Sequence, residues 1–321
     1  MRTRRPVVLL SLVTALAVLA VGWGSQTTSA DSQTTSAGRA VSRAQRPGRS
    51  PAHLIVVLEE NHAFEQIIGS PDAPFLNRLA AHGTLLTHYD AITHPSLPNY
   101  VALLSGHTSL HSDCRACTFP GPTLVDQLQA RHISWAAYLE GLPRPCATTA
   151  RSGLYTEAVD PFMHAADIRH HPARCDQVLP FSRFHTDLTT GRLPTVVFVM
   201  PNLDHEMHSG PVRVADRWLQ RLVDELQASP VWRTDTRLVV TFDESTRRDV
   251  RSCCGGLGRG GRIPTIVAGP QVPKGRDPTP YTHYSLLRSI EAAFGLAFLG
   301  HAGDPATATI PTLADPSPRA R

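Results

Sequence analysis

Lysine is almost absent from this chain. The 321 residues include 31 basic side chains, of which Lys274 is the single lysine and the others are arginine. We attribute this bias to a GC-rich genome rather than to a phosphate-binding surface. Net charge is also low: residues 1–30 contain three arginines and no acid, so without them the charge falls from +4 to +1. A nearly neutral domain gives no electrostatic basis for binding nucleic acid.

An apolar stretch long enough for a comfortable membrane span is also missing at the N-terminus. Residues 7–23 are apolar but short, three arginines precede them, and residues 28–30 (Thr-Ser-Ala) form a cleavage site. This pattern predicts a signal peptide over residues 1–30 and a secreted, extracytoplasmic protein without stable membrane insertion. An uncleaved anchor is the alternative. No cysteine follows the apolar stretch, which argues against a lipoprotein.

The six-residue string Ser-Gln-Thr-Thr-Ser-Ala occurs twice, at residues 25–30 and 32–37. Because this stretch is polar and of low complexity, we predict a disordered linker over residues 31–50. Residues 51–315 are long enough for one large domain with a substantial core, and residues 316–321 are expected to be a disordered tail.

The cysteines all lie in the exported part: Cys114, Cys117, Cys146, Cys175, Cys253 and Cys254. An even number in an oxidising compartment favours disulfides. Cys114–Cys117 and Cys146–Cys175 are the preferred pairs. A redox role for the Cys114 and Cys117 motif is disfavoured because no thioredoxin-like βαβ context surrounds it.

Strand and helix patterns alternate along the folded part. Helices are predicted over residues 73–82, 98–105, 124–130, 216–226 and 284–294, and further strands over residues 134–139 and 263–268. This alternation predicts an α/β fold with a mostly parallel central sheet and helices on both faces. The glycine-rich residues 255–261 lack the spacing of a nucleotide-binding motif.

Three apolar runs of strand length end in clusters of polar residues. They cover residues 54–58, 195–200 and 238–242, and are followed respectively by Glu-Glu-Asn-His, by a segment ending in Glu206-Met-His208, and by Asp243-Glu244. Ligands bind beyond the carboxyl ends of the strands in open α/β sheets. We therefore expect these distant segments to supply one active site.

Glu60 and Asn61 end the first of these strands, and an adjacent carboxylate and amide suit a hard divalent cation. Asp243 and Glu244 repel each other unless a cation lies nearby. The alternatives are solvated turns, or a helix cap by Asn61. Both pairs are predicted metal ligands.

Ser96 precedes a predicted helix with Pro98 in its first turn, where backbone N–H groups and the helix dipole favour a phosphate. A serine nucleophile needs activation by a base or a metal. Asn99, one turn on, is expected to donate to a phosphoryl oxygen. An ordinary serine helix cap is the alternative.

His208 and Glu206 are separated by one residue, so an extended segment would place both side chains on one side. His208 is predicted to protonate a leaving group or bind phosphate. Glu206 is predicted to bind metal or to orient His208. His283, before the last helix, is a weaker candidate, either for phosphate contact or for support of a metal ligand.

In this combination the chain resembles the bacterial phosphoesterase family of secreted acid phosphatases and phosphatidylcholine-type phospholipases C, which is similar in fold to the alkaline phosphatase superfamily. The resemblance covers about residues 51–312. It rests on the ordered segments 53–62, 93–106, 201–208, 242–244, 263–269, 282–291 and 294–296.

The resemblance implies a divalent metal ion held by Glu60, Asn61, Asp243 and Glu244, with Ser96 as the nucleophile and Asn99 as a phosphate ligand. Oxygen ligands suit Mg²⁺, Ca²⁺ or Mn²⁺, while a nearby histidine leaves Zn²⁺ and iron open. The family pattern has aspartate where this chain has Glu206. The arginine- and glycine-rich residues 245–262 are also atypical and form either a substrate loop or plain surface.

These observations predict a secreted, metal-dependent acid phosphatase acting on small phosphate esters through a phosphoserine intermediate. A phospholipase C-type phosphodiesterase is the nearest alternative, and the absence of an added lipid-binding domain disfavours it. An inactive binding protein on the same fold is the alternative from another class.

Overall fold

The computed structural model describes residues 50–233 and 235–314. The predicted signal peptide, nearly all of the predicted linker and the predicted tail fall outside these residues. Within them, no helix is both long and apolar enough to cross a lipid bilayer.

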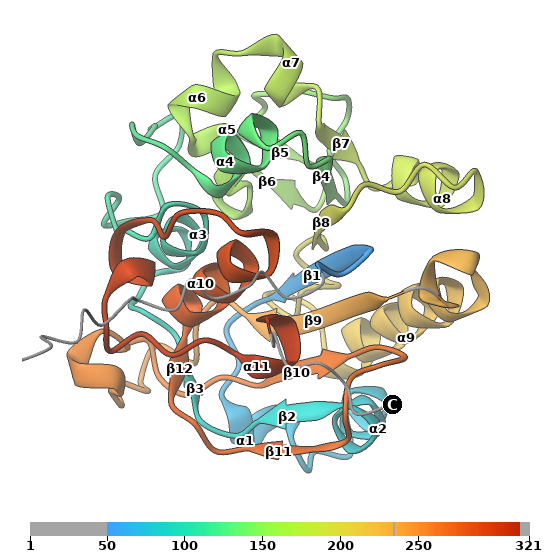
Figure 1. The fold of residues 1–321 in the computed structure, drawn as a ribbon, viewed down its shortest axis with the longest axis vertical. Coiled ribbons are helices and arrows are strands. Elements are labelled where there is room, and N and C mark those ends of the chain that lie inside the picture. The colour runs from blue at the N-terminus through green and yellow to red at the C-terminus, as the bar shows by residue number, and fades with distance from the viewer. Residues whose placement is uncertain (1–49, 234, 315–321) are drawn as a thin grey trace, which may run out of the picture. The chain divides into compact units, whose positions relative to one another are not determined.

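The centre of the fold is an eight-stranded sheet with the strand order β11-β2-β10-β9-β1-β8-β4-β7 (Figure 1). Its strands are β1 (His53–Glu59), β2 (Thr84–Leu86), β4 (Trp135–Leu139), β7 (Val178–Pro180), β8 (Val196–Met200), β9 (Thr236–Phe242), β10 (Thr265–Ala268) and β11 (Gly275–Asp277). Two small sheets pair β3 (Tyr89–Asp90) with β12 (Tyr281–Thr282), and β5 (Arg151–Ser152) with β6 (Tyr155–Thr156).

The described helices are α1 (Phe64–Ile67), α2 (Pro74–His82), α3 (Ser96–Ser105), α4 (Leu124–Ala130), α5 (Pro161–His164), α6 (Ala166–Arg169), α7 (Pro172–Cys175), α8 (Ser182–Thr189), α9 (Val212–Ala228), α10 (His283–Phe294) and α11 (Pro311–Ala314). Helices α2 and α9 lie on one side of the sheet, while α3 and α10 lie on the other (Figure 1). This confirms the predicted α/β architecture.

β1 is the central strand of the site-forming part of the sheet. It pairs in parallel with β8 on one side and with β9 on the other. Residues 54–57 are fully buried, as expected for a β-branched run covered on both faces. β10 is the exception to the parallel pattern, because it runs antiparallel to both β9 and β2.

The amphipathic pattern of α9 is confirmed, since the predicted stripe of Trp218, Leu219, Leu222 and Leu226 is buried. Burying each such side chain stabilises the fold by about 1.5–3 kcal/mol. Asp216 on the same helix has a different role. Its carboxylate accepts the backbone N–H groups of Phe75 and Leu76, at 2.9 and 2.8 Å, and so caps the start of α2 from a distant part of the chain.

Disulfide bonds join Cys114 to Cys117 and Cys146 to Cys175, the two pairs preferred from the sequence. A third bond joins the neighbours Cys253 and Cys254.

Candidate active site

The site lies where β1, β8 and β9 end. Because the three strands are parallel neighbours, the residues after them share one edge of the sheet. Backbone hydrogen bonds hold the ends together. The N–H of Glu60 donates to the carbonyl of Glu206 at 2.7 Å, and the N–H of Asp243 donates to that of Glu59 at 2.9 Å. The predicted convergence of the three polar clusters is therefore present.

Asn61 turns the chain sharply at the end of β1. Its φ of 56° is in the left-handed region, which asparagine tolerates better than most residues. The turn lets its N–H donate to Oδ1 of Asp243 at 3.0 Å, while its side-chain amide donates to Glu60 at 2.7 Å. The other oxygen of Glu60 accepts from the hydroxyl of Tyr100 at 2.8 Å. Glu60 is thus held rigidly at the site.

Ser96 joins this group because its hydroxyl lies close enough to the carboxylate of Asp243 to lower the pKa of that acid against the effect of burial. The sequence placed Ser96 just before a helix starting at residue 98, but α3 begins at Ser96 itself. The helix N-terminus also differs from expectation. The N–H of Leu97 donates to Oδ1 of Asp113 at 2.9 Å, so this donor is already occupied.

Glu244 points to different partners from its neighbour Asp243. Its Oε2 lies 3.2 Å from Nδ1 of His94 and 3.4 Å from the amide nitrogen of Asn99. The hydrogen bond with Glu244 raises the pKa of His94 above its ordinary value. Glu244 also lines the pocket described below, which leaves it accessible to a ligand.

Asn99 is buried and engaged with the loop before α3. Its side-chain oxygen accepts the N–H groups of Ile92 and Thr93 at 2.9 and 3.0 Å, and its nitrogen donates to the carbonyls of Thr93 and Pro95. These contacts fix the segment that carries Ser96. A contact between Asn99 and a phosphoryl oxygen stays a prediction.

Glu206 and His208 do not lie together on an extended segment, contrary to the sequence prediction. The chain forms turns here, and Met207 has a φ of 73°. As a result Glu206 is fully buried, whereas 48% of the His208 side chain is exposed. Nε2 of His208 lies 3.9 Å from Oε2 of Glu60. Both carboxylate oxygens of Glu206 lack a hydrogen-bond partner among the described residues.

His283 is also placed differently from a phosphate ligand. It is buried beneath the site, where its Nε2 donates to the backbone carbonyl of Asp243 at 2.6 Å and its Nδ1 lies 3.2 Å from the Tyr89 hydroxyl. Burial lowers the pKa of His283 to about 4, so the ring is neutral. Of the two roles expected for His283, this position suits support of a metal ligand, because the ring orients Asp243 from beneath the site.

The electrostatics of the site are those of buried acids close to one another. Burial, together with the charge of Glu244, raises the pKa of Glu60 to about 8 against the opposing hydrogen bonds from Tyr100 and Asn61. Burial, followed by the charge of Glu60, holds the pKa values of both Asp243 and Glu206 well above their ordinary range. A cation at this position would remove the repulsion.

The donor set fits a hard divalent cation. Oδ2 of Asp243 is buried and without a partner in the described chain, next to the Ser96 hydroxyl and the Glu60 carboxylate. All the donors are oxygens. The one trio of acidic, cysteine or histidine groups within 4.8 Å of each other in the described residues is Cys146, Cys175 and Asp176, where both sulfurs are in a disulfide. The carboxylates of the proposed metal site do not form such a trio within 4.8 Å. A coordination shell there would also use the side-chain oxygens of Asn61 and Ser96.

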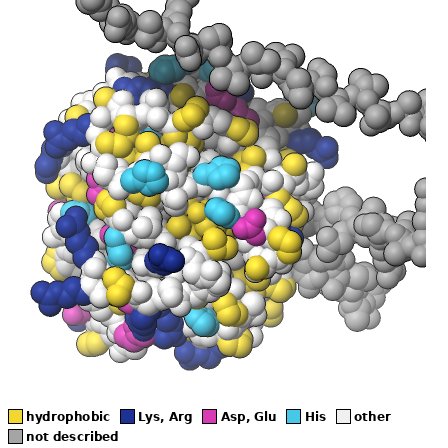
Figure 2. Space-filling view, turned by 90° about the vertical axis from the view of Figure 1, so that its left-hand side faces the viewer, with side chains coloured by type: hydrophobic (Ala, Val, Ile, Leu, Met, Phe, Trp, Pro, Cys, Tyr) yellow, Lys and Arg dark blue, Asp and Glu magenta, His cyan; other side chains and the backbone are white. Residues whose placement is uncertain are grey.

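A pocket of about 430 Å³ opens over these groups. Its lining comes from four separate parts of the chain, and consists of Asn61, Pro95, Ser96, Asp113, His208, Glu244, Thr246 and Arg247. Figure 2 shows the side of the molecule that faces left in Figure 1, where histidine side chains gather centrally and arginines lie mostly towards the edge. The pocket is polar and suits a small, charged substrate.

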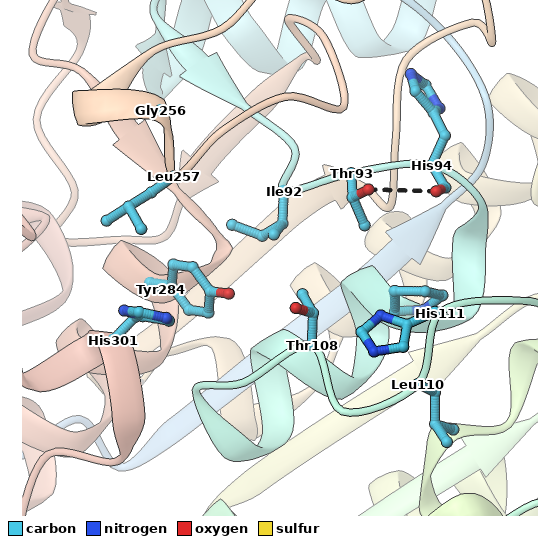
Figure 3. A pocket seen from close by; sticks show the side chains of 11 residues that line it. Ile92, Thr93, His94, Thr108, Leu110, His111, Gly256, Leu257, Tyr284 and His301 are labelled. Atoms are coloured by element: carbon cyan, nitrogen blue, oxygen red, sulfur yellow. Dashed lines mark hydrogen bonds between the residues drawn. The ribbon is translucent and has the colours of Figure 1, made fainter.

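A second pocket, of about 390 Å³, lies across the 93–98 segment from the first (Figure 3). The hydroxyls of Tyr284 and Thr108 face each other there, while the ring of His94 points away from the group. The ring of His301 packs on Tyr284 with centroids 5.0 Å apart. This pocket contains none of the predicted site residues.

Sequence reasoning missed four residues that act on the site: His94, Tyr100, Asp113 and Arg247. Tyr100 follows Asn99 in the motif, yet it fits the apolar stripe of α3 and gives no signal of its polar contact. Asp113 lies two residues after His111 and directly before Cys114, outside the segments that contain the predicted site residues. A signal for Arg247 existed, because the arginine-rich segment 245–262 directly follows Asp243 and Glu244.

The model of the Phosphoesterase family matches residues 69–297 of this chain. The chain belongs to the Phosphoesterase family. It is 34% identical over 256 residues to a phosphatidylinositol-3-phosphatase of Mycobacterium tuberculosis, covering 78% of this chain and 79% of that protein. It is also 32% identical over 232 residues to a phosphate-repressible acid phosphatase of Penicillium chrysogenum, covering 70% of this chain and 55% of the fungal protein. The chain thus spans little more than half of that fungal relative.

A solved structure of an alkaline phosphatase superfamily protein from Vibrio parahaemolyticus superposes with a TM-score of 0.56. At 16% identity, covering 81% of this chain and 71% of the other, this likeness concerns the fold alone. It agrees with the eight-stranded, mostly parallel sheet described above. As a phosphoesterase family member, the chain is a hydrolase of phosphoric esters.

Proposed function

We propose that this phosphoesterase is a secreted, metal-dependent phosphomonoesterase with Ser96 as its nucleophile. The observation that carries the proposal is the position of Ser96, which lines the pocket together with Asn61 and Glu244 and lies beside the buried carboxylate of Asp243. An activated hydroxyl next to clustered oxygen ligands, open to a small polar pocket, suits phosphoryl transfer.

Glu60, Asn61, Asp243 and Glu244 would hold the divalent cation. When bound, such a cation lowers the pKa of a nearby hydroxyl and neutralises phosphoryl charge. The protein contributes rigidity. Tyr100 fixes Glu60, while His283 holds the backbone of Asp243, so the ligands are oriented before a substrate arrives.

The chain's own residues then account for the reaction steps. The Ser96 proton passes to Asp243 as the Ser96 oxygen attacks phosphorus in line, and the bond to the ester oxygen breaks as a phosphoserine forms. His208, which lines the pocket, donates a proton to the departing oxygen. Water then attacks the phosphoserine and gives a proton to His208, while the Ser96 oxygen regains its proton from Asp243 as phosphate leaves. Asn99 keeps the Ser96 segment in place during both steps.

The substrate class is a small phosphate ester, in keeping with the polar pocket and with the named activities of the mycobacterial and fungal relatives. The disulfide bonds within the described residues suit an exported protein, as does the sequence of residues 1–30. Nothing in the net charge favours a nucleic acid partner.

The first test measures hydrolysis of an aryl phosphate by wild type, Ser96→Ala and Asp243→Asn, with divalent cations added one at a time. Both variants should lose activity by at least about 10³-fold, because each removes a group whose contribution is made in the transition state. Ser105→Ala is the matched control, since Ser105 lies in the same helix and bonds within it to the Val101 carbonyl. Turnover by Ser96→Ala at the wild-type rate would disprove the nucleophile. An aryl phosphodiester assayed in parallel separates a monoesterase from a diesterase.

A further inference from the structure

The loop after β9, residues 245–262, is fastened to the protein by a network of ion pairs. Asp249 accepts hydrogen bonds from the Ser245 hydroxyl at 3.0 Å and from Nε of Arg251 at 2.8 Å. Arg251 and Arg262 both reach Glu65 on α1, at 3.3 and 2.9 Å. The loop therefore has a defined position beside the catalytic pocket, visible in orange at the left of Figure 1.

Arg247 lies on this loop but takes no part in the network. It is exposed and lines the catalytic pocket, and its guanidinium forms no ion pair or hydrogen bond with any described residue. It is nevertheless near the catalytic groups, because its charge lowers the pKa of both His208 and Glu244. A cation that lines the pocket and forms no direct ion pair with a described carboxylate is available to a substrate anion.

The position of Arg247 favours contact with the leaving alcohol of the substrate. Ser96 and Asp243 are buried at the inner end of the site, whereas Arg247 and His208 are exposed at the opening. In an in-line displacement, the departing oxygen lies on the side of phosphorus opposite the nucleophile. The leaving alcohol therefore points towards His208 and Arg247. Asp113 is the other charged group at the opening, and its carboxylate is engaged with the N–H of Leu97.

We propose that Arg247 binds a second anionic group on the leaving alcohol, so that the enzyme prefers phosphate monoesters whose alcohol carries a carboxylate or a phosphate. The inference rests on the proposed function, because it places the transferred phosphoryl at Ser96. Arg247 is a specificity-determining residue in this arrangement, and the ion network of the loop holds it in position.

The test compares phenyl phosphates carrying a carboxylate with the same compounds carrying a carboxamide, at the meta and para positions. The readout is the ratio of kcat/KM for carboxylate over carboxamide. This ratio should fall at least about fivefold in Arg247→Gln and recover in part in Arg247→Lys. Arg248→Gln is the matched control, since Arg248 is the exposed neighbour that does not line the pocket. In wild type the ratio should decrease as salt is raised.

An unchanged ratio in Arg247→Gln would overturn the proposal. If kcat/KM falls equally for both substrates, the ratio is also unchanged, and Arg247 then acts on the transferred phosphoryl group. Failure of the proposed function gives a different result, namely no Ser96-dependent hydrolysis of any ester. In that case calorimetric binding of the carboxylate and carboxamide phenylphosphonates still decides whether Arg247 selects a second anion.

Discussion

Tyr100 connects the apolar core to the chemistry of the site. Its ring is buried among core residues, while its hydroxyl reaches Glu60 at 2.8 Å. The carboxylates of Glu60, Asp243 and Glu206 in turn raise the pKa of Tyr100 beyond the effect of burial. Its hydroxyl therefore stays protonated and donates to Glu60 at any physiological pH.

Replacing Tyr100 with phenylalanine should weaken binding of the divalent cation about tenfold, because Glu60 loses the donor that orients it. The measurement is a metal titration followed by calorimetry. Tyr138→Phe is the matched control, since it removes a similar hydroxyl–carboxylate bond, to Asp187 at 2.9 Å, away from the site. If both variants bind metal like wild type, Tyr100 is only a packing residue.

His208 gives the site a pH dependence with a definite sign. Burial lowers the pKa of His208 below its ordinary value; the charge of Asp113 opposes this effect, and the smaller effect of the Arg247 charge adds to it. A general acid must be protonated, so the rate on esters with poor leaving groups should be highest below that pKa and fall as pH rises through it. His208→Asn should lose this limb of the pH–rate profile. An ester with a nitrophenolate leaving group serves as the control, because its departure needs little protonation.

At the scale of elements, the strands were predictable and the loops were not. Residues 54–58 and 238–242 form strands because β-branched runs buried on both faces have few alternatives, and residues 124–130 match α4 at both ends. The convergence of their polar ends followed from parallel pairing. By contrast, β2 and β11 have three residues each, which is too short for an alternation of apolar and polar residues to be recognised in the sequence.

The site residues that sequence reasoning placed wrongly or missed share one cause. Their contacts depend on the conformation of a turn or on how a helix is oriented against the sheet, and neither is encoded in a periodic sequence pattern. Turns around Met207 separate Glu206 from His208, and the rotation of α3 decides that Tyr100 faces Glu60. His283 lies under Asp243 because α10 begins there, next to β12.

Asp216 on α9 caps the start of α2, so replacing it tests a contact between these two helices. Asp216→Ala should lower the free energy of unfolding by about 1–3 kcal/mol, because two buried N–H groups lose their acceptor. Chemical denaturation measures the change. Asp224→Ala, an exposed acid on the same helix, should change stability by less than about 0.5 kcal/mol. Equal stability of Asp216→Ala and wild type would show that the cap contributes nothing.

At the scale of the whole molecule, buried acids outside the metal-ligand set are a common feature. Glu59, Asp160 and Glu291 are each fully buried, and burial raises the pKa of Asp160 to about 7 and that of Glu291 to about 8. The pKa of Glu59 is raised as well, again by burial first. An acid with a raised folded-state pKa keeps its proton in the folded protein at a pH where the unfolded chain has lost it.

The free energy of unfolding should therefore decrease as pH rises from about 4.5 towards 8, since the folded state binds more protons in this window. Glu291→Gln should reduce the slope and raise the melting temperature relative to wild type at pH 8 more than at pH 5. Thermal melts between pH 4.5 and 8.5 measure both effects. Asp224→Asn, which alters an exposed acid, is the control, and a slope unchanged in Glu291→Gln would contradict this account.

The strand order has a consequence for how the chain is made. β1 is the first strand in sequence, yet one of its two neighbours is β9, which begins at Thr236. The polypeptide must be synthesised through β9 before the first strand has both of its neighbours in the sheet. Asp243 and Glu244, which directly follow β9, are added only after that point. A nascent chain of this kind completes its central sheet late, and no part of it made earlier has the full set of acids at the site.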